Sequence, residues 1–275
     1  MESRTGATNL HDLHCDDTRC RSTRRGYVIW PESSTPFTFE DPLANPDGDA
    51  MLRDLAREVR VPILFGSDQV IRRQPIEQSE LYNAAYQLDP DGKTVALYRK
   101  IKLVPFGEFF PFQKWIAFAA PLVNRFVPFR EGTGPVMLPV GSHRASTAIC
   151  YEVVFPSLAR DAVAQGSELL TTVTNDGWYG YSSAPYQHWE MASMRAIEQG
   201  RYMARAANTG ISGIVDPYGR VVTRSGIFEQ VGLVGEARFL TSRTVYSLIG
   251  DVIAYVAIAL TVLAATFSRR HRGSR

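Results

Sequence analysis

The sequence predicts an α/β fold in which short strands alternate with helices along one domain. Three observations support this prediction. From Gly26 to Leu240, short runs of β-branched and aromatic residues alternate with stretches of helical periodicity. Glycine, proline, asparagine and aspartate separate these runs. With 275 residues, of which 45% are hydrophobic, the chain is long enough to bury one sizeable core.

Eight segments have the composition and length of strands. They are residues 27–30, 61–70, 82–89, 95–101, 144–150, 168–174, 212–216 and 221–224. Two turn sequences, DPDG at 89–92 and DPYG at 216–219, separate neighbouring strands. Three segments have the apolar spacing of helices: 49–60, 156–166 and 187–207. We therefore expect one domain over residues 27–243, without internal repeats.

The charge balance argues against a nucleic-acid-binding protein. Thirty lysine and arginine residues stand against 28 aspartate and glutamate residues, for a formal net charge of +2. A surface that tracks phosphates needs a larger positive excess. Three cysteines are also too few for a disulfide framework, and only Cys150 lies in the predicted domain.

The first 26 residues differ from the rest of the chain. They carry scattered charges, with no apolar periodicity and no apolar run of a secretory signal. His11, His14, Cys15 and Cys20 are residue types that bind zinc, but their spacing fits no common zinc pattern. We expect a disordered or atypical N-terminal segment rather than a metal site.

The C-terminus contains the apolar run SLIGDVIAYVAIALTVLAATF, of roughly 20 residues, which is the length that crosses a bilayer. We expect a transmembrane helix over residues 246–267, with a buried core helix as the alternative. The basic tail, residues 268–275, should remain cytoplasmic, which would place the preceding domain across the membrane. Because no export signal is visible, either that domain stays cytoplasmic or upstream membrane helices are missing from this chain.

Three reactive side chains stand where apolar strands end, a common position for active-site groups. They are Glu32, Lys100 and Cys150. Each alone has an ordinary interpretation. Glu32 could be a glutamate of a surface turn, Lys100 part of a solvated basic face, and Cys150 a buried, unreactive cysteine. Together they supply the base, the cation and the thiol nucleophile that acyl transfer requires.

Glu32, Lys100 and Cys150, in this order and in these contexts, resemble the Glu-Lys-Cys triad of the nitrilase (carbon–nitrogen hydrolase) superfamily. The segments WPES, YRKIKLVPFGE, ICYE and TNDGWYG are similar to the apolipoprotein N-acyltransferase branch, as is the apolar run that follows Thr244. The resemblance covers residues 26–267. It implies a four-layer α-β-β-α nitrilase-type sandwich followed by one C-terminal transmembrane helix.

The resemblance also implies a role for each matching residue. Cys150 would be the nucleophile, Glu32 the general base and Lys100 the cation that stabilises the oxyanion. Glu108 would be a second essential carboxylate that steers Lys100 or the proton. The implied reaction is ping-pong: the thiolate takes an acyl chain from the sn-1 ester of a phospholipid, expected to be phosphatidylethanolamine. The α-amine of a diacylglyceryl-cysteine lipoprotein then accepts it, without a metal or organic cofactor.

Other residues are candidates for contact with lipid. By the same resemblance, Tyr151 and Glu152 would shape the acyl pocket. Residues 109–129 are rich in phenylalanine and interrupted by proline, which suits an arm that dips into the lipid interface; a loop packed on the domain's own core is the alternative. Trp178 and Tyr179 are either core aromatics or part of the acyl-chain wall.

The sequence departs from this branch in two places. Lys102 stands where many members carry histidine, and no bundle of membrane helices precedes Gly26. Two other functions therefore remain open: a hydrolase of small amides, which needs neither the span nor the aromatic arm, and an inactive membrane-anchored fragment. The leading interpretation places the enzyme in the bacterial inner membrane, with its catalytic domain on the extracytoplasmic, periplasmic face.

Overall fold

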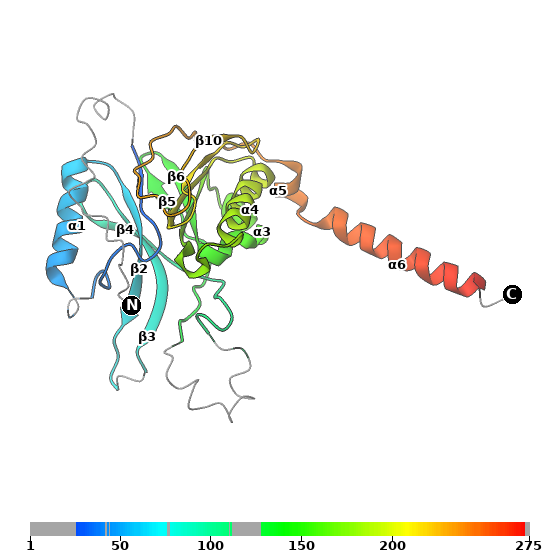
Figure 1. Ribbon diagram of the computed structural model, residues 1–275, viewed down its shortest axis with the longest axis horizontal. Coiled ribbons are helices and arrows are strands. Elements are labelled where there is room, and N and C mark those ends of the chain that lie inside the picture. The colour runs from blue at the N-terminus through cyan, green and yellow to red at the C-terminus, as the bar shows by residue number, and fades with distance from the viewer. Residues whose placement is uncertain are drawn as a thin grey trace.

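The computed structural model describes residues 26–41, 43, 45–75, 78–109, 111 and 128–272 of the chain. They form two β-sheets that face each other, with helices on both outer surfaces (Figure 1). The predicted N-terminal segment, apart from Gly26, lies outside the described residues. The same holds for most of the predicted aromatic arm and for the end of the basic tail.

The first sheet has four strands in the order β1-β2-β3-β4. They are β1 (Val28–Ile29), β2 (Ile63–Ile71), β3 (Glu80–Leu88) and β4 (Thr94–Arg99). β1 runs parallel to β2, and the other neighbours are antiparallel. The predicted DPDG turn joins β3 to β4, where the Asp89 carboxylate accepts hydrogen bonds from the amides of Asp91 and Lys93. Gly92 completes this turn with a φ of 74°.

The second sheet has six strands in the order β10-β9-β8-β7-β6-β5. They are β5 (Leu138–Val140), β6 (His143–Ile149), β7 (Leu169–Asn175), β8 (Met203–Asn208), β9 (Gly213–Val215) and β10 (Val221–Arg224). β6, β7 and β8 are parallel, and the other pairs are antiparallel. The loops that follow β6 and β7 therefore leave the sheet at the same end, where α/β proteins place their sites.

The described residues also contain five helices and two short 3₁₀ turns. They are α1 (Pro46–Val59), η4 (Cys150–Val154), α3 (Pro156–Ala164), η5 (Asp176–Tyr179), α4 (Ala184–Gln199), α5 (Val245–Ile249) and α6 (Val252–Arg272). α1 begins where the Asn45 side chain accepts a hydrogen bond from the Gly48 amide, with Pro46 in the first turn. Its bounds are close to those of the predicted helix over residues 49–60.

Helix α4 corrects the predicted helix over residues 187–207. It begins at Ala184, with Pro185 in its first turn, and ends at Gln199. It ends there because Gly200 takes the left-handed conformation, with a φ of 61°. The next residues form β8, whose pairing with β7 in the centre of the sheet outweighs the helical spacing of their apolar side chains.

Three hydrophobic clusters stack these elements into a four-layer α-β-β-α sandwich. The central cluster joins the two sheets and includes Leu64 from the first and Val173 from the second. A second cluster packs α1 through Leu52 onto the outer face of the first sheet. The third packs α3 and α4, with Trp189, onto the outer face of the second sheet (Figure 1). This architecture confirms the predicted nitrilase-type α/β sandwich.

The predicted transmembrane helix over residues 246–267 is not supported. The apolar run is divided, because α5 ends at Ile249, Gly250 takes a φ of 58°, and α6 begins at Val252. From there to Phe267 the apolar part extends roughly 24 Å, at 1.5 Å per residue, against about 30 Å of hydrocarbon in a bilayer. Across the described part of the chain, no helix has both the length and the hydropathy that a membrane span needs.

The alternative interpretation of this run, a buried core helix, is also wrong. α6 projects away from the sandwich (Figure 1). Its side chains are exposed from Val252 to Phe267.

Candidate active site

The three predicted catalytic residues come from both sheets and meet at one end of the sandwich. Glu32 follows β1, Lys100 follows β4, and Cys150 follows β6 as the first residue of η4. Lys100 Nζ lies 3.8 Å from Glu32 Oε1, and the charges of both residues act on the Cys150 thiol. All three side chains are buried. The structure thus brings the predicted trio into one cluster.

The Glu32 carboxylate is held at both oxygens. Oε1 accepts a hydrogen bond from Asn83 Nδ2 at 2.6 Å, and Oε2 accepts one from the Asn175 amide, at the end of β7, at 2.7 Å. β2 approaches the Glu32 turn closely, since the Gly66 amide donates to the Pro31 carbonyl. A Cβ at Gly66 would lie 2.5 Å from Glu32 Cα, so this position requires glycine.

Lys100 is the buried cation of the site. Its Nζ donates to Glu108 Oε1 at 2.8 Å, and the same oxygen accepts from Asn83 Nδ2 at 2.8 Å. Glu108 Oε2 accepts from the Val104 amide, also at 2.8 Å. Burial lowers the pKa of Lys100, but its electrostatic interactions with Glu32, Cys150 and Glu108 outweigh burial and raise it. Lys100 therefore remains protonated at neutral pH.

Cys150 sits in a strained turn. Its φ of 50° is in the left-handed region, which costs a residue with a side chain about 1–3 kcal/mol. Burial, followed by the charge of Glu32, raises the pKa of the thiol to about 11, although Lys100 and Thr174 act to lower it. The resting group is therefore a thiol, and attack on a carbonyl requires a base that removes its proton.

This arrangement can perform nucleophilic acyl transfer. Glu32 is the carboxylate available to take the thiol proton, and Lys100 offers positive charge to an oxyanion. Glu108 and Asn83 hold these two groups in place through the hydrogen bonds above. Within the described ranges, no three His, Cys, Asp or Glu side chains are placed to hold a metal ion. The N-terminal histidines and cysteines considered as zinc ligands lie outside those ranges.

Glu152, expected in the acyl pocket, is fully buried and links the two sheets. Its Oε1 accepts hydrogen bonds from the amides of Ile101 and Lys102, at 2.5 and 3.0 Å. Its Oε2 accepts from the Tyr98 hydroxyl and the Ile149 amide, both at 2.8 Å. The carboxylate therefore joins the loop after β4 to the end of β6, where the nucleophile turn begins.

Replacing Glu152 with alanine should destabilise the fold by about 3 kcal/mol, because three amides and a hydroxyl would be buried without their acceptor. The melting temperature, followed by circular dichroism, should fall by roughly 6–12 °C. Glu190→Ala, on the exposed face of α4, is the matched control and should change stability by less than about 0.5 kcal/mol. Equal melting temperatures for the two variants would contradict the linking role of Glu152.

The three aromatic residues predicted to contact lipid lie in different environments. Tyr151 is half-buried and packs edge-on against Phe155, with ring centroids 5.1 Å apart. Trp178 is 87% exposed, so its interpretation as a core aromatic is wrong. Tyr179 is 37% exposed, and its ring lies edge-on to His188, with ring centroids 6.1 Å apart. A role of these rings in the acyl-chain wall stays a prediction.

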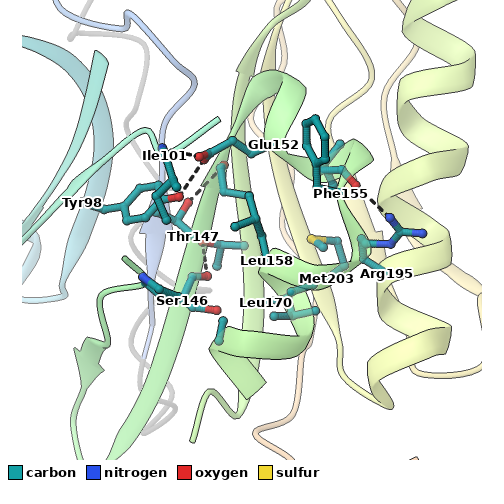
Figure 2. Close-up of a pocket in the computed structure, with 16 residues that line it drawn as sticks. Tyr98, Ile101, Ser146, Thr147, Glu152, Phe155, Leu158, Leu170, Arg195 and Met203 are labelled. Atoms are coloured by element: carbon teal, nitrogen blue, oxygen red, sulfur yellow. Dashed lines mark hydrogen bonds between the residues drawn. The ribbon is translucent and has the colours of Figure 1, made fainter. Parts of the chain in front are cut away.

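A cavity of about 30 Å³ lies next to this site, among residues of β6, β7, α3 and α4 (Figure 2). Figure 2 shows Tyr98 and Glu152 on one side of it and Leu158 and Met203 on the other. This volume holds about two water molecules, and Cys150 does not line it. The cavity is therefore too small, and wrongly placed, to hold an acyl chain.

Several residues of the site were not predicted from the sequence. Asn83 lies within β3 and contacts both carboxylates, although no motif surrounds it. A buried asparagine in an apolar strand is the signal that could have marked it, because such a side chain needs a partner. Asp176, His188 and Arg205 form a buried network beside the nucleophile. Asp176 lies within the TNDGWYG segment, but its contacts with His188 and Arg205 are not evident from local sequence.

Asp68 is a further carboxylate of this end of the sandwich. It pairs with Asn83 across β2 and β3, so the two side chains lie on the same face of the sheet. Burial, followed by the charges of Glu32 and Glu108, raises the pKa of Asp68 to about 6. The folded protein therefore binds a proton more tightly than the unfolded chain, whose aspartates titrate near pH 4. Stability should fall as pH rises from about 4 to 6 and then remain at the lower value.

Replacing Asp68 with asparagine should raise the free energy of unfolding by about 2 kcal/mol at pH 8, because the costly buried charge is removed. At pH 4 the two proteins should be nearly equal, since Asp68 is then protonated in the folded state. Urea unfolding at both pH values measures the difference. A stabilisation of the same size at pH 4 and pH 8 would exclude the titration of Asp68 as its cause.

Comparisons with known proteins identify the family of this chain. Residues 21–236 match the carbon–nitrogen hydrolase family. Apolipoprotein N-acyltransferases of Geobacter metallireducens and Bradyrhizobium diazoefficiens are 36% and 38% identical to this chain, over 92% and 88% of its length. The same alignments cover 48% and 45% of those proteins. The chain thus spans about half the length of the curated relatives it matches.

A solved structure shows the same fold. An amidase from Nesterenkonia sp. superposes with a TM-score of 0.52 and 24% sequence identity, over 77% of this chain and 78% of the amidase. The family match covers both sheets and includes Glu32, Lys100 and Cys150. Fold, site and sequence similarity lead to one conclusion: the chain belongs to the carbon–nitrogen hydrolase family.

Proposed function

We propose that this chain carries the catalytic domain of an enzyme that transfers a fatty acyl chain from a phospholipid to the N-terminal amine of diacylglyceryl-cysteine lipoproteins. The observation that carries the proposal is a buried thiol, Cys150, clustered with the Glu32 carboxylate and the Lys100 ammonium. The similarity to relatives named apolipoprotein N-acyltransferase supports acyl transfer as the reaction.

In the first half-reaction, Cys150 Sγ attacks the sn-1 ester carbonyl of the phospholipid while Glu32 accepts the thiol proton. The carbonyl oxygen becomes an oxyanion, which Lys100 Nζ stabilises. The C–O bond of the ester then breaks. Glu32 returns the proton to the departing alcohol, so the products are a lysophospholipid and an acyl thioester on Cys150.

In the second half-reaction, the lipoprotein amine attacks the thioester carbonyl. Glu32 accepts a proton from the attacking amine, and Lys100 again stabilises the oxyanion. The C–S bond breaks, the thiolate takes the proton from Glu32, and an amide is released. Glu108 contributes by holding Lys100 at 2.8 Å in both halves. The side chains of the site supply every proton transfer, so we propose no metal or organic cofactor.

The substrates place the enzyme at a membrane. We propose the bacterial inner membrane, with the catalytic domain on the extracytoplasmic face and phosphatidylethanolamine as the acyl donor. Exposed apolar side chains support contact with lipid, since soluble surfaces seldom expose large apolar patches. On α6 they include Ile253, Tyr255, Ile258, Leu260, Val262 and Phe267, each at least 57% exposed. Tyr151, Trp178 and Tyr179 are our candidates for the wall around the acyl chain.

Intact-protein mass spectrometry tests this function. The full chain, purified in detergent, is incubated with phosphatidylethanolamine of defined acyl composition. We expect a mass increase of one acyl group, which hydroxylamine removes because it cleaves thioesters. Adding a synthetic diacylglyceryl-cysteine peptide should discharge the adduct and produce the N-acylated peptide.

Two results would contradict the proposal. Folded protein that takes up no acyl chain but releases ammonia from small amides would be a hydrolase of small amides. Folded protein with neither activity would be an inactive fragment. Circular dichroism of the same sample shows whether the protein is folded.

A further inference from the structure

A buried polar network lies beside the nucleophile. It comprises Asp176 at the start of η5, His188 in α4 and Arg205 in β8, each at most 5% exposed. Arg205 Nη2 forms an ion pair of 2.8 Å with Asp176 Oδ2, and His188 Nδ1 lies 2.9 Å from Asp176 Oδ1. The Thr174 hydroxyl donates to the same carboxylate at 3.0 Å. None of these side chains takes part in the chemical steps proposed above.

His188 connects this network to Cys150. Its Nε2 lies 3.0 Å from the carbonyl oxygen of Cys150. Because a carbonyl can only accept, Nε2 carries a proton and donates it. The other ring nitrogen, Nδ1, contacts Asp176 and lies 3.1 Å from Arg205 Nη2. Both nitrogens are therefore held, and the ring has one defined orientation.

The hydrogen bond acts where the backbone is strained. The φ of 50° at Cys150 is one that residues with side chains rarely adopt, and it persists only where neighbouring groups hold it. If the carbonyl of Cys150 were released, the turn could relax toward a common conformation. The thiol would then move relative to Glu32 and Lys100.

The same strand end also holds the general base. The Asn175 amide, at the end of β7, donates to Glu32 Oε2 at 2.7 Å. The next residue is Asp176, which orients His188. The segment Asn175–Asp176 therefore holds the Glu32 carboxylate directly. It also holds the Cys150 turn, because Asp176 orients His188. Small changes in such relative positions have large effects on reaction rate.

We propose that His188 is a positioning residue that holds the Cys150 turn in its reactive conformation, with Asp176 and Arg205 fixing the imidazole ring. The inference rests on the proposed function only in taking Cys150 as the nucleophile. It gives α4, which otherwise serves as a packing helix, a direct influence on the chemistry.

Two substitutions separate positioning from packing. His188→Gln places an amide nitrogen near the position of Nε2, so it keeps a donor for the Cys150 carbonyl. His188→Asn places an amide nitrogen near the position of Nδ1, so it keeps the contact with Asp176 and loses that donor. Both remove the same ring. We expect similar melting temperatures for the two variants and very different reactivity of Cys150.

The hydrogen bond itself can be observed by NMR. Labelling cysteine with ¹³C at the carbonyl and tyrosine with ¹⁵N selects one peptide bond, because Cys150–Tyr151 is the one Cys-Tyr pair in the sequence. We expect the Cys150 carbonyl resonance of His188→Gln to stay near that of the wild type and that of His188→Asn to shift. Should His188→Asn not fold, Asp176→Asn leaves the ring but removes the group that orients it, and should shift the resonance in the same direction.

Reactivity is measured as the rate of Cys150 alkylation by iodoacetamide, with peptide mass spectrometry to separate Cys150 from Cys15 and Cys20. We expect His188→Gln to remain within about threefold of the wild type and His188→Asn to lose roughly 100-fold. His143→Asn, at the opposite end of β6, is the matched control and should not change the rate.

Equal rates and equal carbonyl shifts in the Gln and Asn variants would overturn the role of His188. Neither measurement uses a phospholipid. Wild-type protein that is alkylated at Cys150 but takes up no acyl chain would therefore contradict the proposed acyl transfer and leave the positioning role standing.

Discussion

Replacing Cys150 with alanine should abolish acyl transfer, with a loss of at least 1,000-fold. The reason is that Cys150 is the one cysteine among the described residues, and its thiol is the nucleophile proposed to form the acyl intermediate beside Glu32 and Lys100. Intact-protein mass spectrometry should find no hydroxylamine-labile adduct, and no N-acylated peptide should form. The substitution removes one sulfur from a side chain that is 6% exposed, so the fold should persist.

Cys150→Ser provides the matched control for the chemistry. A serine hydroxyl is nearly the same size as the thiol but ionises much less readily, and it should be comparably inactive. Cys15 and Cys20 lie outside the described residues and could take up acyl groups without being catalytic. An adduct that persists in Cys150→Ala and still passes to the acceptor peptide would contradict the assignment of the nucleophile.

Replacing Glu32 with glutamine should slow thioester formation by about 1,000-fold, within the range expected for loss of a general base. Burial, the largest cause of the raised pKa of the Cys150 thiol, is unchanged in this variant, and the thiol then has no carboxylate to accept its proton near neutral pH. Glutamine keeps an oxygen for the Asn175 amide, which donates to Glu32 at 2.7 Å, but its amide nitrogen cannot accept the hydrogen bond that Asn83 Nδ2 donates to the other oxygen. Circular dichroism checks that the variant is folded. The nucleophile remains, so an adduct should still form slowly.

The measurement is the rate of adduct formation in a single turnover, followed as a function of pH. Above pH 7, the rate in Glu32→Gln should rise steeply with pH until the Cys150 thiol of this variant has ionised, whereas the wild-type rate should change much less. Glu190→Gln, which removes a carboxylate on the exposed face of α4, is the control and should keep the wild-type pH profile. A Glu32→Gln rate within threefold of the wild type would exclude this residue as the base.

Local sequence was most informative about the positions of the three reactive side chains. Strand composition and the positions of strand ends predicted where Glu32, Lys100 and Cys150 would stand, and the structure brings them together. These predictions succeeded because an apolar strand that stops at a polar residue is a local signal.

Boundaries that depend on a single backbone conformation were predicted less well. The apolar run near the C-terminus was counted as one helix, but Gly250, with a φ of 58°, divides it into α5 and α6. In the same way, Gly200 ends α4 before β8 begins. In both cases hydrophobic spacing continues past a glycine at which the chain changes direction.

By itself, the sequence determined the α/β class, the order of the three reactive residues and their resemblance to the nitrilase superfamily. Only the tertiary structure decided which groups hold these residues in place. Asn83 and Asn175 donate hydrogen bonds to Glu32, and His188 donates one to the Cys150 carbonyl. Glu152 accepts hydrogen bonds from both sides of the interface between the sheets. The physical reason is distance along the chain. Glu32 and its partner Asn175 are 143 positions apart, and their hydrogen bond exists because two sheets pack face to face at their strand ends.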